Sequence, residues 1–154
     1  MSAGFLLDTS VISALAPGRE AHLSVDLAPW LQAHDAQLFL PCVAVAELAQ
    51  GIGKLRRAGA AQRADRLDDW LDQLIAGFGE RILPLDTLAA RLSGQLVDEA
   101  TAKGRHPGFA DVAIAAIAMQ ANHLLLTRNL KHFEPLGIAC ADPFKQLPGD
   151  WPTP

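Results

Sequence analysis

Short apolar segments alternate with helical patterns along most of this chain. The segments are apolar at consecutive positions rather than at every second one, and they cover residues 5–7, 38–40, 82–85, 124–127 and, near the end, 138–140. Strands of this composition are buried on both faces, which is typical of a parallel sheet that is covered by helices. We therefore expect an α/β fold built on a central, mostly parallel sheet of four to five strands.

The helical patterns fall between these expected strands. Residues 61–78 form the clearest one, because their apolar side chains recur at steps of three and four. Residues 110–121 are almost uniformly apolar, so this helix should be buried on most sides. The other expected helices run from Val11 to about Pro17, around residues 27–31, over 43–54 and after Asp86.

The chain has 154 residues, half of them apolar, and lies within the usual size range of one domain. We expect a single domain over residues 1–142 and a proline-rich tail over residues 143–154. Phe144 and Trp151 are the side chains of this tail that can dock on the domain.

No apolar run approaches the roughly 18 residues that span a bilayer, and no secretory signal opens the chain. We therefore expect a soluble, cytoplasmic protein with no membrane segment. Cys42 and Cys140 are too few for a disulfide framework and lack the spacing of metal ligands, so we expect two buried, reduced thiols.

The charge balance is mildly acidic. Thirteen Lys and Arg against seventeen Asp and Glu give a formal net charge of −4. This balance counts against a protein that holds nucleic acid chiefly by bulk positive charge. A metal ion or a local basic patch can still recruit a polyanion.

Four polar residues stand where the expected strands end. Asp8 follows the first strand, and Glu47 lies one helical turn after the second. Asp111 lies in the first turn of the most apolar helix, and Asn129 follows the fourth strand. Ligands of an open parallel sheet bind outside the carboxyl ends of its strands, so these four positions are the candidates for a site.

Three buried carboxylates in one crevice would repel one another and raise one another's pKa values. A divalent cation relieves this repulsion, and hard oxygen ligands favour Mg²⁺ or Mn²⁺. No histidine or cysteine stands at these four positions, which argues against a structural zinc site. A cation held by Asp8, Glu47 and Asp111, with Asn129 beside it, can activate water against a phosphodiester, which predicts a metal-dependent nuclease.

Each of these residues also has a purely structural interpretation. Asp8 can cap the first helix, and Asp111 can complement a helix dipole. Asn129 is a common residue in turns. Glu47 is harder to explain as a solvated side chain, because its neighbours on the helix are apolar. The joint placement at strand ends, rather than any single residue, favours the nuclease.

Other polar residues flank the expected site. Thr9 and Ser10 can orient Asp8 or serve as caps. His106 and His132 can contact phosphate or assist proton transfer, whereas the remaining histidines, His22, His34 and His123, are interpreted as incidental surface residues. Thr127 and Arg128 are further candidate supporting residues of the site. The rim also carries four basic residues that can form a local basic patch, for which a solvated surface is an equally good interpretation: Lys103, Arg105, Arg128 and Lys131.

Five segments of the chain resemble the successive motifs of a PIN domain, in particular of the VapC and FitB toxins. They are FLLDTSVISAL (5–15), VAVAELAQGI (43–52), RILPLD (81–86), FADVAIAAIAMQ (109–120) and LLLTRNLKHF (124–133). The resemblance covers nearly the whole chain and implies a three-layer α/β/α fold. It also implies a Mg²⁺- or Mn²⁺-dependent endoribonuclease that acts as the toxin of a VapBC-type toxin–antitoxin pair.

The family's acids fall on Asp8, Glu47 and Asp111. Members of the family carry a fourth acid where this chain has Asn129, or three residues later, where it has His132, so this chain lacks it. The resemblance further implies a homodimer, and a heterotetramer or larger assembly with a cognate antitoxin. The helices over residues 43–78 are expected to form the antitoxin groove, the dimer surface or both, although burial in the core is an equal alternative.

Two other functional classes stay open at this point. The missing fourth acid suggests a catalytically impaired, PIN-like module that binds RNA or protein. A phosphoryl-transfer protein of the receiver or haloacid-phosphatase type also places an Asp after its first strand. These phosphatases need a second Asp two residues later, where this chain has Ser10, and receivers need an acidic pair before the first helix.

Overall fold

A computed structural model describes residues 4–19 and 23–149. Its centre is a five-stranded sheet with the order β3-β2-β1-β4-β5, in which every pair of neighbours is parallel. The strands are β1 (Phe5–Leu7), β2 (Leu38–Pro41), β3 (Ile82–Leu83), β4 (Leu124–Leu126) and β5 (Cys140–Ala141). The expected α/β fold with a parallel sheet of four to five strands is confirmed.

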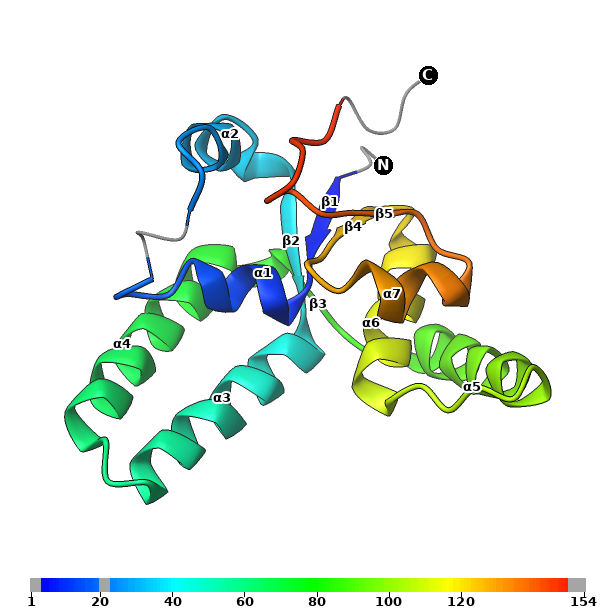
Figure 1. The fold of residues 1–154 in the computed structure, drawn as a ribbon, viewed down its shortest axis with the longest axis horizontal. Coiled ribbons are helices and arrows are strands. Elements are labelled where there is room, and N and C mark those ends of the chain that lie inside the picture. The colour runs from blue at the N-terminus through cyan, green and yellow to red at the C-terminus, as the bar shows by residue number, and fades with distance from the viewer. Residues whose placement is uncertain (1–3, 20–22, 150–154) are drawn as a thin grey trace.

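Helices cover both faces of the sheet (Figure 1). One face carries α1 (Thr9–Ala14), α2 (Leu27–Ala33), α3 (Cys42–Arg57) and α4 (Ala61–Phe78). The other carries α5 (Thr87–Ala102), α6 (Phe109–Ala121) and α7 (Leu130–Phe133). Short 3-10 turns η2 (Asp35–Gln37), η3 (Gly79–Arg81) and η4 (Glu134–Leu136) complete the elements. The chain thus forms the three layers that the resemblance implied.

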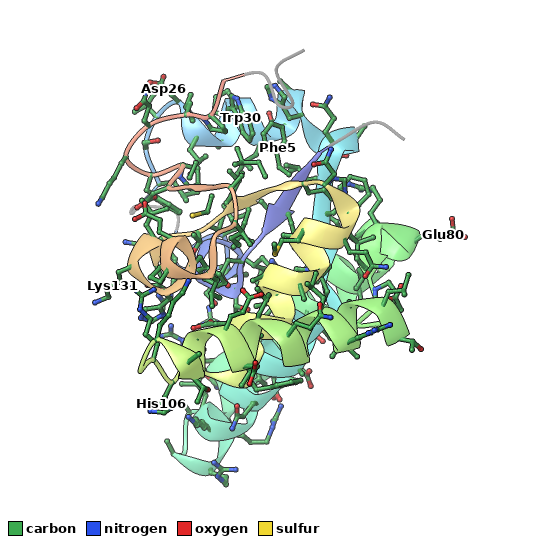
Figure 2. All side chains as sticks on the ribbon, turned by 90° about the vertical axis from the view of Figure 1, so that its right-hand side faces the viewer. Phe5, Asp26, Trp30, Glu80, His106 and Lys131 are labelled. Carbon is green, nitrogen blue, oxygen red and sulfur yellow. The ribbon has the colours of Figure 1, made fainter. Side chains whose placement is uncertain are left out.

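Alternate residues of the central strand enter two separate cores. Phe5 and Leu7 pack with α1 and α2 on one face, where Phe5 also meets the ring of Trp30 edge-on at 4.9 Å between centroids (Figure 2). Leu6 packs with α5 and α6 on the other face. Both faces are therefore apolar, which explains why the strand sequences show no polar alternation. The helix α6 is buried continuously from Val112 to Ala118, as its composition predicted.

The ends of β2, β3, β4 and β5 differ by one or two residues from the sequence-based expectation, and two of these differences have a direct structural cause. The strand β3 ends at Leu83, because Pro84 follows and has no N–H to donate to the ladder. The last strand covers Cys140–Ala141 instead of 138–140, since its register pairs these residues with Leu125 and Leu126 of β4. Both differences concern strand ends, where local sequence is least informative.

The segment after β5 packs back on the domain. Asp142 is buried and accepts a hydrogen bond from the N–H of Phe144 at 2.9 Å. Phe144 and Leu147 pack against the core that contains Phe5, so the expected docking of Phe144 is confirmed. Trp151 lies outside the described residues, and the domain boundary at residue 142 stays a prediction.

The two cysteines correct one expectation. Cys42 and Cys140 are free thiols, but both are only half-buried rather than buried. The Sγ atom of Cys42 accepts a hydrogen bond from the N–H of Leu85 at 3.2 Å, which ties the start of α3 to the segment after β3. No helix in the described part of the chain is long and apolar enough to cross a membrane.

Candidate active site

The strand order reverses between β1 and β4, so a ligand crevice is expected at the carboxyl ends of these strands. The chain passes from β1 to β2 and β3 on one side of the sheet, and then returns to the other side for β4 and β5. Such a reversal of strand order is where open α/β sheets bind ligands, at the carboxyl ends of the strands. Asp8 follows β1 at this point, and Thr127 follows β4.

Asp8 is buried at this crevice, with 3% of its surface exposed. Its Oδ2 atom accepts two hydrogen bonds, from Ser10 Oγ at 2.7 Å and from Thr127 Oγ1 at 2.8 Å. Its Oδ1 atom accepts none from the described residues. A buried carboxylate oxygen without a protein partner is rare and calls for a water or an ion as its partner.

The side chain of Asp8 does not cap the helix that follows it. Asp8 occupies the N-cap position of α1, yet it makes no capping hydrogen bond. The structural interpretation of Asp8 as a simple cap is therefore wrong. Its hydrogen bonds come from Ser10 and Thr127 instead, so the fold holds this carboxylate between the segments that follow β1 and β4.

The hydroxyls that hold Asp8 also fix the loop after β4. Ser10 Oγ accepts a hydrogen bond from the N–H of Arg128 at 3.1 Å, and Thr127 Oγ1 accepts one from the N–H of Asn129 at 3.0 Å. The two segments that follow β1 and β4 are thus tied together at the site. Ser10 and Thr127, predicted as supporting residues, both contact Asp8 directly.

Asp111 lies in the first turn of α6 and interacts electrostatically with Asp8. Partial burial raises the pKa of Asp111, and the negative charge of Asp8 raises it further, whereas His132 lowers it. The Nδ1 atom of His132 lies 3.3 Å from Asp111 Oδ2. The structure therefore brings Asp8 and Asp111 close enough to repel each other, as the sequence analysis expected of acids in one crevice.

Glu47 is placed differently from the other two acids. It lies half-buried on α3, and its Oε1 atom accepts a hydrogen bond from Thr9 Oγ1 at 2.6 Å. Thr9 is the chain neighbour of Asp8, so Glu47 is tied to the site through this one residue. Across residues 4–19 and 23–149, no three His, Cys, Asp or Glu side chains are grouped as metal ligands.

Asn129 stands at the start of α7 and is half-buried. It occupies the N-cap position, but its side chain makes no capping hydrogen bond. Its backbone is held by Thr127 as described above. The amide side chain is therefore available beside the site, although the structure does not assign it a ligand.

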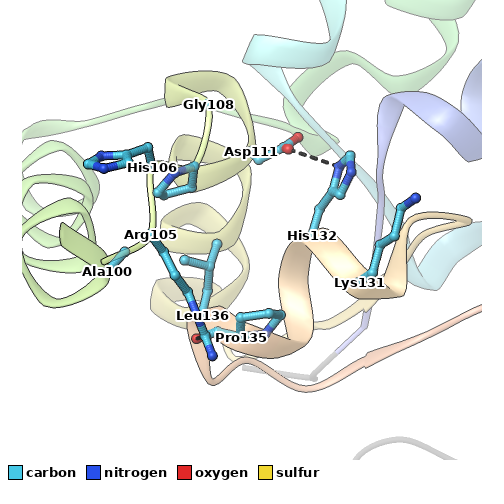
Figure 3. Close-up of a pocket in the computed structure, with 10 residues that line it drawn as sticks. Ala100, Arg105, His106, Gly108, Asp111, Lys131, His132, Pro135 and Leu136 are labelled. Carbon is cyan, nitrogen blue, oxygen red and sulfur yellow. Dashed lines mark hydrogen bonds and ion pairs between the residues drawn. The ribbon is translucent and has the colours of Figure 1, made fainter. Parts of the chain in front are cut away.

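The basic residues of the rim separate into three places. The guanidinium of Arg128 stacks over the ring of Phe144, 4.6 Å from its centroid. Arg105, His106, Lys131 and His132 line a cleft of about 300 Å³ with Asp111 (Figure 3). Lys103 borders another, smaller hollow together with Glu99. The sequence analysis had treated these residues as one rim, and only the structure divides them.

Two aromatic or imidazole groups have roles that the sequence did not suggest. Phe144 supports Arg128, and no local pattern could have paired residues that lie sixteen positions apart. His123 is buried, not a surface residue as expected: its Nδ1 atom accepts a hydrogen bond from the N–H of Gly4 at 2.8 Å. Burial lowers the pKa of His123.

His22 lies outside the described residues, and half-buried His34 stacks on Trp30.

The donors at this site suit a hard divalent cation. Asp8 contributes a buried oxygen that no described residue contacts, and Asp111 is a second carboxylate that Asp8 repels. Mg²⁺ is usually held by one or two carboxylates and completes its shell with water, so this pair fits it. Glu47 and Asn129 stand beside the pair as further oxygen donors.

Comparison with known proteins shows the family and the fold to which this chain is similar. A model of the PIN domain family matches residues 5–135. A VapC ribonuclease of Sinorhizobium fredii is 30% identical over 91% of this chain and 97% of its own length. Toxin FitB of Neisseria gonorrhoeae is 31% identical over 90% of this chain and 97% of its own length. The crystal structure of FitAcB from Neisseria gonorrhoeae superposes with a TM-score of 0.75 at 30% identity, over 90% of this chain and 97% of that one.

Proposed function

The chain belongs to the PIN domain family, and we propose that it is a metal-dependent endoribonuclease that hydrolyses RNA phosphodiester bonds as the toxin of a VapBC-type toxin–antitoxin pair. Relatives that match over nearly their whole length are named as a VapC ribonuclease and as a toxin, which supports this activity. The observation that carries the proposal is the buried Asp8, whose Oδ1 atom has no partner among the described residues and whose charge acts on Asp111.

Asp8 and Asp111 hold the cation in this proposal, with Glu47 as the third acid. Mg²⁺ or Mn²⁺, when bound, supplies positive charge to the phosphodiester and lowers the pKa of a water. Thr127 and Ser10 keep Asp8 in position through their hydrogen bonds to Oδ2. Outer hydrogen bonds of this kind orient carboxylate ligands and raise the affinity of metal sites.

The remaining residues act on the substrate or on the acids. Arg128 is held by Ser10 through its backbone N–H and by Phe144 through its side chain, and in this proposal its charge attracts a phosphate. His132 contacts Asp111 and steadies that carboxylate. Thr9 steadies the carboxylate of Glu47 through its hydrogen bond. Asn129 offers its amide oxygen as a further donor beside the acids.

The proposed partners are RNA, a cognate antitoxin and a second copy of the chain, in a homodimer that forms a heterotetramer or larger assembly with the antitoxin. A groove of about 290 Å³ between α1, α3 and α4 supports the proposal of an antitoxin partner. Glu47 lines this groove, so a segment bound there would lie next to one of the proposed site acids. Its apolar lining comes from the helices that the sequence analysis assigned to a partner: Leu48, Ile52, Leu55, Leu67 and Trp70. Because the proposed substrate is RNA, we propose that the protein acts in the cytoplasm.

Cleavage of RNA by the purified chain tests this proposal. We expect cleavage with Mn²⁺ or Mg²⁺, none in EDTA, and recovery when the metal is restored. Asp111→Asn should abolish cleavage and leave the thermal unfolding cooperative, because the variant removes a charge and keeps the shape of the side chain. Cleavage by Asp111→Asn at the wild-type rate, in a preparation free of contaminating ribonuclease, would contradict the assignment.

A second candidate is a PIN-like module that binds RNA or protein without cutting it. The chain has Asn129 and His132 where a fourth acid is expected, and the described residues contain no preformed group of three metal ligands, which together favour this alternative. Titration with Mn²⁺, followed by the cleavage assay at saturating metal, separates the two. Membership of the PIN domain family gives the phosphoryl-transfer alternative no support.

A further inference from the structure

The cleft beside Asp111 is basic in a chain that is acidic as a whole. The net charge of the chain is −4, yet this cleft is lined by Arg105, His106, Lys131 and His132 and by a single acid, Asp111. Its volume of about 300 Å³ is enough for a group of the size of a nucleotide phosphate with its water. The local charge is thus opposite to the average charge.

Two segments that are distant in sequence build this cleft. Arg105 and His106 come from the loop between α5 and α6, whereas Lys131 comes from α7 (Figure 3). His106 and Lys131 project from the same edge of the molecule (Figure 2). The loop is fixed at Arg105, whose backbone N–H donates to Ala100 O at 2.8 Å.

The cations of this cleft are not neutralised by acidic neighbours. The Nη1 atom of Arg105 donates to the carbonyl oxygen of Pro135 at 3.3 Å, which holds the side chain, and Arg105 makes no ion pair with the described part of the chain. Lys131 makes no hydrogen bond or ion pair with the described residues. Arg56, by contrast, lies 2.7 Å from Asp65 and 3.7 Å from Asp68 on the exposed side of the α3–α4 pair.

Arg105 and Lys131 thus line the cleft beside Asp111 without an ion pair to any described residue. Two such cations next to a carboxylate site favour an anionic ligand that approaches the same site. The N-terminus of α6 borders the cleft as well, since Gly108 lines it and stands at the N-cap position. The free N–H groups of a helix start also favour anions. Lys103 does not line this cleft but borders an adjoining hollow with Glu99, which shares Ala100, Pro135 and Leu136 with the cleft.

We propose that this cleft binds two RNA backbone phosphates, one at Arg105 and one at Lys131, next to the phosphate at the acidic site. The inference rests on the proposed function, because it takes RNA as the ligand. In this proposal the two cations strengthen the binding of RNA, whereas the acids take part in its cleavage. Backbone contacts of this kind position a strand without reading its sequence.

Salt-dependent binding of RNA tests the proposal without any need for cleavage. The probe is a short fluorescein-labelled single-stranded RNA, and its affinity for the full chain is measured by anisotropy in EDTA over a series of salt concentrations. Each phosphate contact contributes about 0.7 to the slope of log K against log salt for a single strand. Arg105→Gln with Lys131→Gln should therefore weaken binding and reduce the slope by about 1.4.

The matched control is Arg66→Gln with Arg91→Gln, which removes the same charge from exposed positions of α4 and α5 outside the cleft. This control should keep the wild-type slope, and so should the charge-conserving pair Arg105→Lys with Lys131→Arg. A wild-type slope in the cleft variant, or an equal loss in the control, overturns the proposal. If the double variant does not fold, Lys131→Gln alone should reduce the slope by about 0.7, and an unchanged slope again overturns it.

The outcomes separate this proposal from the proposed function. A reduced slope in the cleft variant, with no cleavage by the wild-type chain in Mn²⁺, retains the cleft and rejects the nuclease. Cleavage by the wild-type chain, with an unchanged slope in the cleft variant, retains the nuclease and rejects the cleft.

Discussion

Asp8 and Asp86 occupy the same local position in two regions of the molecule. Each follows a strand of the sheet and stands at the N-cap of the next helix. Asp86 is exposed, and its Oδ1 atom accepts a hydrogen bond from the N–H of Ala89 at 2.9 Å. Asp8 is buried and makes no such bond, since its partners are Ser10 and Thr127.

The difference between the two aspartates comes from the strands beside them. Asp86 lies after β3, at the edge of the sheet, where its carboxylate meets only its own helix and Gln120. Asp8 lies after β1, at the centre, where the residues that follow β4 come within hydrogen-bonding distance. An aspartate at an N-cap position is therefore drawn away from capping where the strand order supplies hydrogen-bond partners from another part of the chain.

The strongest test compares the same substitution at both positions. Asp8→Asn should lower the rate of RNA cleavage by about 1000-fold or more, because it removes a charge that neutralises and holds the cation. Asp86→Asn should cleave as the wild type does, since Asn caps a helix as well as Asp. Equal rates for the two variants in a metal-supplemented cleavage assay would contradict the distinction.

A smaller effect is expected when only the support of Asp8 is removed. Thr127→Val keeps the volume of a fully buried side chain but deletes the hydroxyl that donates to Asp8 Oδ2. Loss of such an outer partner typically costs about 10- to 100-fold in metal affinity or activity. Cleavage rates titrated against Mn²⁺ measure this loss, and Thr127→Ser, which restores the hydroxyl, should recover most of it.

The cap at Asp86 should matter for stability instead of activity. Asp86→Ala removes the bonds to Ala89 and Gln120, so the melting temperature should fall by a few degrees at neutral pH. The hydrogen bond from Ala89 lowers the pKa of Asp86 below 3.8, so this stabilisation is present above that pH and is lost as pH falls through the lowered pKa. Thermal unfolding near neutral pH and at acid pH, with Asp86→Asn as control, measures both effects. An equal deficit at both pH values would argue against the cap.

The smallest effect concerns the two ends of β4. Thr127 follows this strand at the site, whereas His123 precedes it and is buried with a lowered pKa. The neutral ring is favoured in the fold, so its contribution to stability is complete above the unfolded pKa of 6.5 and is lost as pH falls below it. Urea unfolding at about pH 7.5 and pH 5.5 should show this loss in the wild type, and less of it in His123→Asn. The same pH dependence in both would exclude His123 as its source.

Much of the fold could be predicted because its signals are local. The helix over Ala61–Phe78 has the expected bounds, since the spacing of its apolar residues is set by the helix itself. The strand β5 begins two residues and ends one residue later than expected, because its ends depend on pairing with β4. The half-burial of Cys42 and the burial of His123 were missed for the same reason, as neighbours from other segments decide them.

The candidate site could be predicted in part. Asp8 and Asp111 were predicted as site residues because a carboxylate at the end of an apolar strand or in an apolar helix costs free energy unless a cation or hydrogen bonds compensate it. The sequence did not reveal that Thr127 holds Asp8 or that Phe144 supports Arg128, since these contacts join segments that no short pattern connects. It also placed Glu47 with the other acids, which stays a prediction; the structure ties Glu47 to Thr9, the chain neighbour of Asp8.

The sequence by itself determined the parallel sheet, the layers of helices and the polar residues at the strand ends, because apolar periodicity and helix caps act over a few residues. Only the tertiary structure decided which aspartate is a cap and which is buried with an open oxygen, and which basic residues share a cleft. Burial and electrostatic interaction depend on distances through space, and the strand order sets these distances between residues more than a hundred positions apart.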